Sequence, residues 1–516
     1  MDAQTILEIK PALSVFLRQF DDCFCQRRTR RHLGVYVRGQ LSDLDRKSVE
    51  PMADAAGVPA RSLQEFLGLF KWDHEAIRDR LQRRVAARHA DAHSVGIIDE
   101  TSFAKKGDKT ACVQRQHCGS LGKLENCVVS VHLGYAAGDF HTLLDAELYL
   151  PEQTWHNNRA RCRAAGIPDD VVYRPKWRIA LEQVGRALGS GVRFAWWTFD
   201  EAYGGKPAFL RELAGLGQNY VAEIPVSFVG WTVPPTVLHR DHARERAQAQ
   251  GSVMGRPRRL PRLKVKHTPA CAVRDLLKHS PILRRTAWQR YRVKEGVKGP
   301  FVWEAKCVPF WIKDERGLPD GPYRLLIARN VLNADATKFF LSNAPLDTPV
   351  ETLLLVAFSR WRIERLFEDS KTELGLDHFE VRQYRAITRH LLLTCVSHLF
   401  LAEFVQQATA PARPAPARPA SARPASARPA PARQEKKRRD AHGLPGADRH
   451  PAADADLVGG GSLLAPPGRK HRRPVDPHAT TQRRRRPQPP QTHPTPPVGH
   501  QRTATRCTDV SVEIAL

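Results

Sequence analysis

The chain has 516 residues, of which 81 are Lys or Arg and 54 are Asp or Glu, so its formal charge is +27 at pH 7. This length exceeds one ordinary hydrophobic core and predicts two or three domains, while the charge favours a polyanionic partner. Ten cysteines without a CxxC spacing argue against a zinc ribbon or disulfide framework, and the lack of an 18-residue apolar run argues against membrane insertion.

The positive charge is spread over the chain. Residues 411–516 hold 20 basic and 8 acidic side chains, which leaves 61 basic against 46 acidic in residues 1–410. The remainder is therefore basic in its own right, and nucleic acid is the expected partner.

Residues 1–90 have apolar positions at steps of three and four, which predicts a helical domain. Within it, residues 48–70 have the pattern of two helices joined by a tight turn at Gly57. A helix-turn-helix would present Arg61 and Gln64 outward, where they can reach a DNA groove. The alternative is an ordinary helical hairpin in a bundle, whose basic side chains contact phosphates rather than bases.

Residues 93–226 change to alternating strands and helices. We predict strands at 95–99, 127–135, 143–149, 192–199 and 219–225, and helices near 158–165, 176–189 and 206–216. Three strands, then helix, strand, helix and strand is the order of a ribonuclease-H-like sheet. In that order the first and fourth strands end side by side, which would bring Asp99 and Asp200 together.

Residues 227–345 are basic, punctuated by proline and rich in strand-like segments, which predicts a β-rich insertion. The loop at 255–267 either contacts phosphate or is merely solvated. Trp288, Trp303 and Trp311 are candidates for stacking on an unpaired base, with core packing as the alternative for each.

A long helix is predicted from Thr348, with a capping box formed by Thr348 and Glu351 and a stop at Gly375. Glu364 lies inside this helix and shares one face with Arg360 and Lys371.

The segment after residue 405 lacks Phe, Trp and Tyr, and residues 411–516 contain 19 of the 39 prolines. Such a composition cannot bury enough apolar surface to order itself, so we expect disorder. A shifted reading frame is one hypothesis for the abrupt change.

Asp99, Asp200 and Glu364 come from two strand ends and one helix. Carboxylates on distant elements can meet on a pair of divalent cations, which stabilise the attacking and leaving oxygens of a phosphodiester. The neighbours Glu100, Glu201, Glu368 and Asp369 compete for these assignments. Alternatively, the aspartates are turn residues at strand ends and the glutamates are partners in surface salt bridges.

The segments IIDETSFAKKG, WWTFDEAYGG and RWRIERLFEDSKTELGLDHFEVR occur in this order, preceded by SLQEFLGLFKWD. In these motifs the chain resembles insertion-sequence transposases of the IS701 type, within the DDE superfamily. The resemblance implies that Asp99, Asp200 and Glu364 bind two Mg²⁺ or Mn²⁺ ions. It also implies that Arg360 and Lys371 belong to a tyrosine, arginine, glutamate, lysine signature, although Ala357 occupies the tyrosine position.

Two lysines after the first strand, Lys105 and Lys106, are expected to contact the DNA backbone. The whole chain is thus predicted to have an α/β fold with four parts: a helical DNA-binding domain (1–90), a ribonuclease-H-like catalytic core with a mixed sheet flanked by helices (91–226 and 346–405), a β-rich insertion (227–345) and a disordered tail (406–516).

The expected activity is metal-dependent cleavage at the element ends followed by transfer of the 3′-hydroxyl into target DNA. The partners would be terminal repeats and target DNA, bound by a homodimer in the cytoplasm at the nucleoid, without a nucleotide cofactor. One alternative is a decayed transposase that only binds DNA, and another is a nuclease of the same fold that cuts without strand transfer.

Overall fold

The computed structural model describes residues 3–239, 241–252, 260–266, 268–296, 299–333 and 335–409. The expected tail (406–516) lies outside these residues from 410 onward, and its first four residues end α15 (Tyr384–Thr409). Of the predicted phosphate-contacting loop at 255–267, residues 255–259 and 267 also lie outside them. All described residues belong to one unit, Met1–Arg418.

The N-terminal residues are helical, as predicted. They form α1 (Ala3–Leu17), the 3₁₀ turn η1 (Arg18–Cys23), α2 (Arg27–Gln40), α3 (Val49–Ala55), α4 (Ala60–Gly68) and α5 (His74–Arg88). The turn between α3 and α4 uses Gly57 with φ +62°, and the Val58 amide donates to the Ala53 carbonyl. A positive φ of this kind suits glycine because it has no Cβ. Arg61 and Gln64 lie on the exposed side of α4.

Among the described residues, twelve strands form one mixed sheet in the order β10-β7-β12-β13-β14-β6-β5-β1-β3-β2, with β11 paired to β12 and β4 paired to β3. Its strands are β1 (Val95–Ala104), β2 (Gln114–Cys118), β3 (Lys123–Ala137), β4 (Phe140–Leu148), β5 (Trp196–Phe199), β6 (Tyr220–Glu223), β7 (Val229–Trp231), β10 (Cys271–Ala272), β11 (Gln289–Gly296), β12 (Gly299–Lys313), β13 (Pro319–Asn330) and β14 (Thr337–Ser342). A separate pair consists of β8 (Val237–Leu238) and β9 (Arg262–Leu263).

The strands predicted between residues 93 and 226 are present, with different lengths. The short strand β2 was missed, because its sequence QRQHC carries almost no apolar signal. β5 begins at Trp196 rather than at residue 192. The strands of the 227–345 segment continue the sheet, because β14 pairs with β6 antiparallel.

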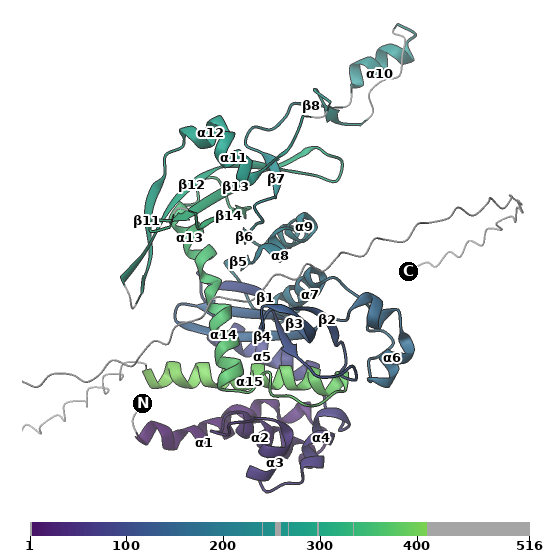
Figure 1. Cartoon of the computed structure of the whole chain (residues 1–516), viewed down its shortest axis with the longest axis vertical. Coiled ribbons are helices and arrows are strands. Elements are labelled where there is room, and N and C mark those ends of the chain that lie inside the picture. Colours follow the sequence, from purple (N-terminus) through teal and green to yellow (C-terminus); the bar gives the residue numbers. More distant parts are fainter. Residues whose placement is uncertain are drawn as a thin grey trace, which may run out of the picture. The chain divides into compact units, whose positions relative to one another are not determined.

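The helices after β4 are η2 (Glu152–His156, a π-helical turn), α6 (Arg159–Ala164), α7 (Lys176–Gly189), α8 (Glu201–Gly204), α9 (Pro207–Gly215), α10 (His242–Ala249), α11 (Val273–His279), α12 (Pro281–Arg285), α13 (Val350–Ser359), α14 (Trp361–Thr372) and α15 (Tyr384–Thr409). α14 lies across β1, β3 and β4 (Figure 1). It packs closely at Gly134, where an added Cβ would lie 2.9 Å from Ile363 Cδ1. α7 contacts the sheet from the opposite face, where the Gln183 side chain donates to the Val131 carbonyl over 3.0 Å.

The predicted long helix from Thr348 is divided in two, and its predicted capping box is absent. α13 begins at Val350 after Pro349, without a hydrogen bond from a capping side chain. Instead, Arg324 from β13 donates to the carbonyls of Pro345 and Thr348. Gly375 ends the second helix as predicted, with φ +66°.

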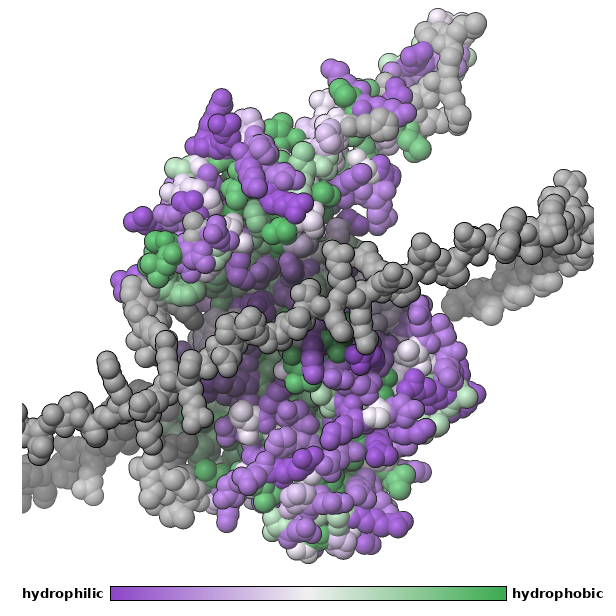
Figure 2. Space-filling model, in the orientation of Figure 1, coloured by the Kyte–Doolittle hydropathy of each residue, from purple (hydrophilic) through white to green (hydrophobic). Residues whose placement is uncertain are grey.

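α15 joins the N-terminal helices to the sheet, since it contacts α1, α2, α4, α5 and β4 (Figure 1). Among the described helices it is the one long and apolar enough to cross a membrane, but 67% of that window is buried inside the structure. The buried Arg389 donates to the carbonyls of Phe66, Leu67, Phe70 and Trp72. α15 therefore has the contacts of a core helix. The side of the N-terminal helices turned to the viewer is mainly hydrophilic (Figure 2).

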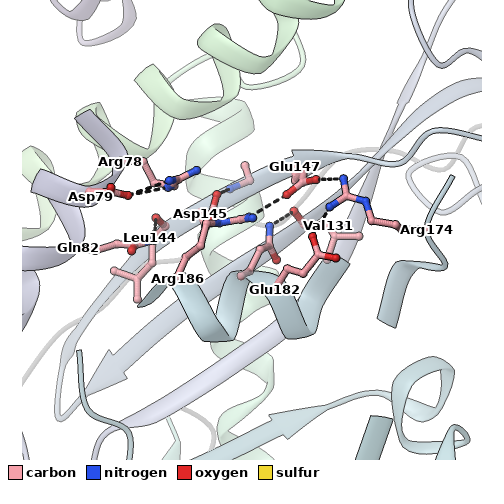
Figure 3. A network of polar contacts seen from close by, with 12 residues as sticks. Arg78, Asp79, Gln82, Val131, Leu144, Asp145, Glu147, Arg174, Glu182 and Arg186 are labelled. Carbon is pink, nitrogen blue, oxygen red and sulfur yellow. Dashed lines mark hydrogen bonds and ion pairs between the residues drawn. The ribbon is translucent and has the colours of Figure 1, made fainter. Parts of the chain in front are cut away.

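A network of ion pairs attaches α7 to β4 (Figure 3). Arg186 on α7 donates to Asp145 over 2.9 Å and to Glu147 over 2.8 Å. Arg174 contacts Glu147 and Glu182. The two guanidinium groups thus form ion pairs with three carboxylates, and the most buried of these, Asp145, is only 4% exposed.

Candidate active site

Three acidic residues lie in a row across three neighbouring parallel strands: Asp99 within β1, Asp200 directly after β5 and Glu223 at the end of β6. The strand predicted to end at Asp99 continues to Ala104, because β1 pairs with β3 over that whole length. β1 pairs with β5 in parallel, with Ile98 opposite Phe199, and β5 pairs with β6 in parallel, with Phe199 opposite Ala222. The residues that follow Ile98, Phe199 and Ala222 are Asp99, Asp200 and Glu223, respectively. Because side chains alternate between the faces of a sheet, the three share one face in this register.

That face is the one covered by α14. Asp99 stands opposite His132 on β3, and the His132 ring stacks edge-on against Phe367 of α14 at 5.1 Å. The sheet and this helix therefore place Asp99 and Glu364 on facing elements.

Local hydrogen bonds fix the two aspartates. Asp99 Oδ1 accepts from the Glu100 amide over 2.7 Å, and Asp200 Oδ1 caps α8 by accepting from the Ala202 amide over 3.0 Å. The turn of α8 lies directly on β6, because a Cβ added at Gly204 would come 1.9 Å from the Glu223 carbonyl oxygen. Only glycine permits this approach, which brings the Asp200 turn against Glu223.

One guanidinium group connects the strand ends to the helix. Arg360 Nη1 donates to Asp99 Oδ2 over 3.2 Å, and Arg360 Nη2 donates to Glu364 Oε1 over 3.1 Å. Arg360 Nε lies 3.8 Å from Glu223 Oε2. Arg360 is the residue between α13 and α14. Its side chain thus contacts Asp99, Glu364 and Glu223 from the point where the helix is broken.

The acids are incompletely neutralised. Burial, and then the charge of Asp200, raise the pKa of Asp99 to about 7, although its backbone hydrogen bond and Arg360 act in the opposite direction. Burial also raises the pKa of Asp200 against the influence of Arg360. Tyr203 is buried near these charges, and its hydroxyl has no hydrogen-bond partner among the described residues.

The donor chemistry of this site fits a hard divalent cation. Carboxylate oxygens are the ligands that Mg²⁺ and Mn²⁺ prefer, and a cation would relieve the repulsion between Asp99 and Asp200. In the described part of the chain, no three His, Cys, Asp or Glu side chains are arranged to hold a metal. Arg360 occupies one oxygen of Asp99 and one of Glu364, so a cation that used these oxygens would have to displace the Arg360 bridge.

The competing carboxylates have other partners. Glu100 accepts from Lys176 over 2.6 Å, whereas Glu368 and Asp369 both pair with Arg365. These contacts match the salt-bridge alternative considered for the glutamates. Glu201 is an exposed residue in the first turn of α8.

A cavity of about 360 Å³ adjoins Glu364. It is lined by residues of β1, the β2–β3 hairpin and α14, including Glu100, Ser102, His117, Ser120, Glu364 and Lys371. Lys371 is half-buried, and burial lowers its pKa. The predicted basic residue of the last helix thus lies in the same cavity as Glu364.

The other expected DNA contacts lie in different environments. Lys105 donates to the Phe379 carbonyl over 2.7 Å and stacks on the Phe379 ring, and burial lowers its pKa to about 8. Lys106 is exposed. Arg61 and Gln64 line a different cavity, of about 850 Å³, together with Arg382 and Arg385.

Of the three candidate tryptophans in the 227–345 segment, Trp303 is buried, whereas Trp288 and Trp311 are half-buried. Trp303 is 5% exposed and stacks on Phe358 of α13, and Trp288 lies between Lys306 and Arg329. Trp311 stands opposite Trp231 in the sheet. For Trp288 and Trp303 these contacts favour the packing alternative over base stacking.

Histidines His132 and His378 make structural contacts. His132 hydrogen-bonds Ser130 over 2.6 Å, and the His378 ring accepts from the Lys47 amide over 3.0 Å. His117 lines the cavity beside Glu364.

Sequence reasoning missed Glu223 and its partner Lys338 of β14, which donates to Glu223 over 2.6 Å. The available signal was positional: Glu223 ends the third strand of a parallel series whose first two strands also lead into acidic residues. In parallel sheets, ligands bind outside the carboxyl ends of the strands.

Two comparisons with known proteins bear on this site. Residues 19–300 match the family described as DDE superfamily endonuclease, a range that contains Asp99 and Asp200 and ends before Glu364. The chain is also 33% identical over 190 residues to a probable transposase for insertion sequence element IS701 from Microchaete diplosiphon. That alignment covers 36% of this chain and 46% of the relative.

Proposed function

Since the chain belongs to the DDE superfamily of endonucleases, we propose that it is an insertion-sequence transposase that uses Asp99, Asp200 and Glu364 as its metal-binding triad. The observation that carries this proposal is the row of acids across β1, β5 and β6, in which Asp99 is linked to Glu364 through Arg360. The chain spans about half the length of the relative named for IS701, so the complete reaction is part of the proposal.

The sheet supports a ribonuclease-H-like core. Antiparallel β4, β3 and β1 are followed by parallel β5 and β6, in the neighbouring order β4-β3-β1-β5-β6. This is the arrangement expected from the order of elements along the chain, and it places the first two acids side by side.

Asp99 and Asp200 would hold a divalent cation, with a second one shared with Glu364 once the Arg360 bridge opens. Two Mg²⁺ or Mn²⁺ ions supply an activated water or hydroxyl and stabilise the departing oxygen in phosphodiester displacement. Arg360 would move its charge from the carboxylates to the scissile phosphate. Lys371, in the cavity beside Glu364, would hold the neighbouring phosphate of the same strand.

The partners that follow from this function are the two element ends and a target duplex. Joining two ends in one event requires at least a dimer on DNA. The reaction would take place in the cytoplasm, at the nucleoid. The exposed Arg61, Gln64 and Lys106 are proposed to contact DNA outside the reacting strand. No nucleotide cofactor is part of the proposal.

A plasmid assay tests the function. Purified protein is incubated with Mg²⁺ or Mn²⁺ and a plasmid carrying the genomic flanks of the gene, beside the Asp99→Ala variant. We expect excised and joined products from the wild type only. Equal absence of products with retained binding of the ends would instead identify a protein that only binds DNA. Cleavage without joined products would identify a nuclease.

A further inference from the structure

We propose that Glu223, anchored by Lys338, is a positioning residue for Arg360 and thereby sets how readily a divalent cation reaches Asp99 and Glu364. The inference rests on the proposed function, because it concerns ions bound by the same acids. It adds a role for two residues on β6 and β14.

Arg360 is shared unequally among three carboxylates. Its terminal nitrogens donate to Asp99 and Glu364 over 3.2 and 3.1 Å, whereas its Nε lies 3.8 Å from Glu223. Arg360 is 22% exposed and Glu223 is 19% exposed, so solvent screens their interaction only partly. Glu223 is therefore close enough to attract the guanidinium without being its main partner.

The Arg360 bridge competes with an ion. Arg360 binds Asp99 Oδ2 and Glu364 Oε1, which are oxygens that a cation between these two carboxylates would use. In the described part of the chain, no three His, Cys, Asp or Glu side chains are arranged to hold a metal. Any interaction that draws Arg360 toward Glu223 weakens the bridge and eases metal entry.

Lys338 controls the strength of this attraction. Its ammonium donates to Glu223 Oε1 over 2.6 Å and neutralises part of the charge that Arg360 would otherwise meet. Lys338 belongs to β14, which pairs with β6 beside Glu223. The residues between β6 and α13 thus supply a charge that acts on the site through one neighbouring carboxylate.

Two substitutions should shift metal affinity in opposite directions. Glu223→Gln removes the alternative partner of Arg360 and should weaken Mn²⁺ binding about fivefold. Lys338→Met leaves Glu223 free to attract Arg360 and should tighten Mn²⁺ binding about threefold. Both constants are measured by electron paramagnetic resonance titration of Mn²⁺ on the full chain without DNA, after thermal melting has shown that each variant folds.

The charges of Glu223 and Lys338 could also change Mn²⁺ affinity directly, by long-range electrostatics, and the two shifts would then have the same directions. Two controls distinguish this direct effect from an effect through the position of Arg360. In an Arg360→Met background, the effect of Glu223→Gln should fall below twofold, because the residue through which Glu223 acts is gone. Lys176→Met is the matched charge control, since Lys176 pairs with Glu100 over 2.6 Å and lies on α7. It should change the Mn²⁺ constant less than Lys338→Met does.

The outcomes distinguish this inference from the proposed function. Equal Mn²⁺ binding by wild type and by Asp99→Asn with Asp200→Asn would contradict the metal site itself. Binding that depends on the aspartates, but responds to Glu223→Gln equally with and without Arg360, would overturn the positioning role alone.

Discussion

Two groups of acids on the same sheet and the helices packed against it are neutralised differently. On β4, Asp145 and Glu147 face two guanidinium groups, Arg186 and Arg174, in the network that attaches α7 (Figure 3). At the candidate active site, by contrast, the single guanidinium group of Arg360 contacts all three of Asp99, Glu364 and Glu223.

This difference in neutralisation distinguishes acids that serve the fold from acids that are candidates for binding a cation. A buried carboxylate that has its own hydrogen-bonded cation is compensated within the fold, and removal of that cation leaves an uncompensated buried charge that destabilises the protein. Asp200 makes no ion pair within the described residues, and the pKa of Asp99 is raised to about 7 by burial and by Asp200. Acids held together with too little positive charge are typical of sites that bind a cation.

The largest expected effect is on catalysis. Asp99→Asn and Asp200→Asn should each lower strand cleavage by at least about 10³-fold, because each removes charge from the proposed ion site. Each variant should melt at the same temperature as the wild type or higher, since buried repulsion is relieved. Gel assays of cleaved ends and thermal melting measure the two quantities. A variant that unfolds would show that these acids serve structure.

The opposite result is expected in the β4 network. Arg186→Met leaves Asp145, 4% exposed, without its main partner and should lower the free energy of unfolding by about 3 kcal/mol. Cleavage per folded molecule should be unchanged. Denaturant melts check the stability, and the double variant with Asp145→Asn should recover part of the loss. Unchanged stability in Arg186→Met would remove the contrast between the two groups.

A smaller effect concerns pH in metal-free buffer. The folded-state pKa of Asp99, about 7, lies above its ordinary value of 3.8, so the folded protein retains a proton that the unfolded chain has lost. Stability should therefore fall as pH rises from about 4 to 7 and should change no further above that range through this group. Asp99→Asn should flatten this dependence by at least about 1.4 kcal/mol, the equivalent of one pK unit. Melts of both proteins across pH 4 to 8 measure the difference, and parallel curves would contradict it.

The sequence predicted the part of this site that depends on order along the chain. Alternating strands and helices predicted that Asp99 and Asp200 end neighbouring strands. β1 does pair with β5, and Asp200 follows β5, but β1 continues past Asp99 to Ala104. Glu364 was expected on a helix, and it lies on α14.

Contacts between distant segments could not be predicted in the same way. The predicted cap at Thr348 is absent, because α13 begins one residue later, after Pro349, and the Thr348 carbonyl is bound by Arg324 from another strand. Glu223 had no motif of its own, and its importance comes from the pairing of β14 with β6 and from Lys338. Local sequence patterns report hydrogen bonds between near neighbours, whereas these groups meet only after the sheet has formed.

The smallest expected effect concerns two adjacent lysines, of which one has partners within the fold and the other is exposed. Lys105 has its own partners, the Phe379 carbonyl and ring, whereas the adjacent Lys106 is exposed. If DNA runs past this turn, Lys106→Ala should weaken binding by a few-fold and reduce the slope of log affinity against log salt by about 1, as loss of one phosphate contact does. Lys105→Ala should instead lower thermal stability, because the space it fills beside Phe379 becomes empty. Titrations with end-containing duplexes at several salt concentrations measure the first effect. An unchanged salt slope for Lys106→Ala would place the DNA path away from this turn.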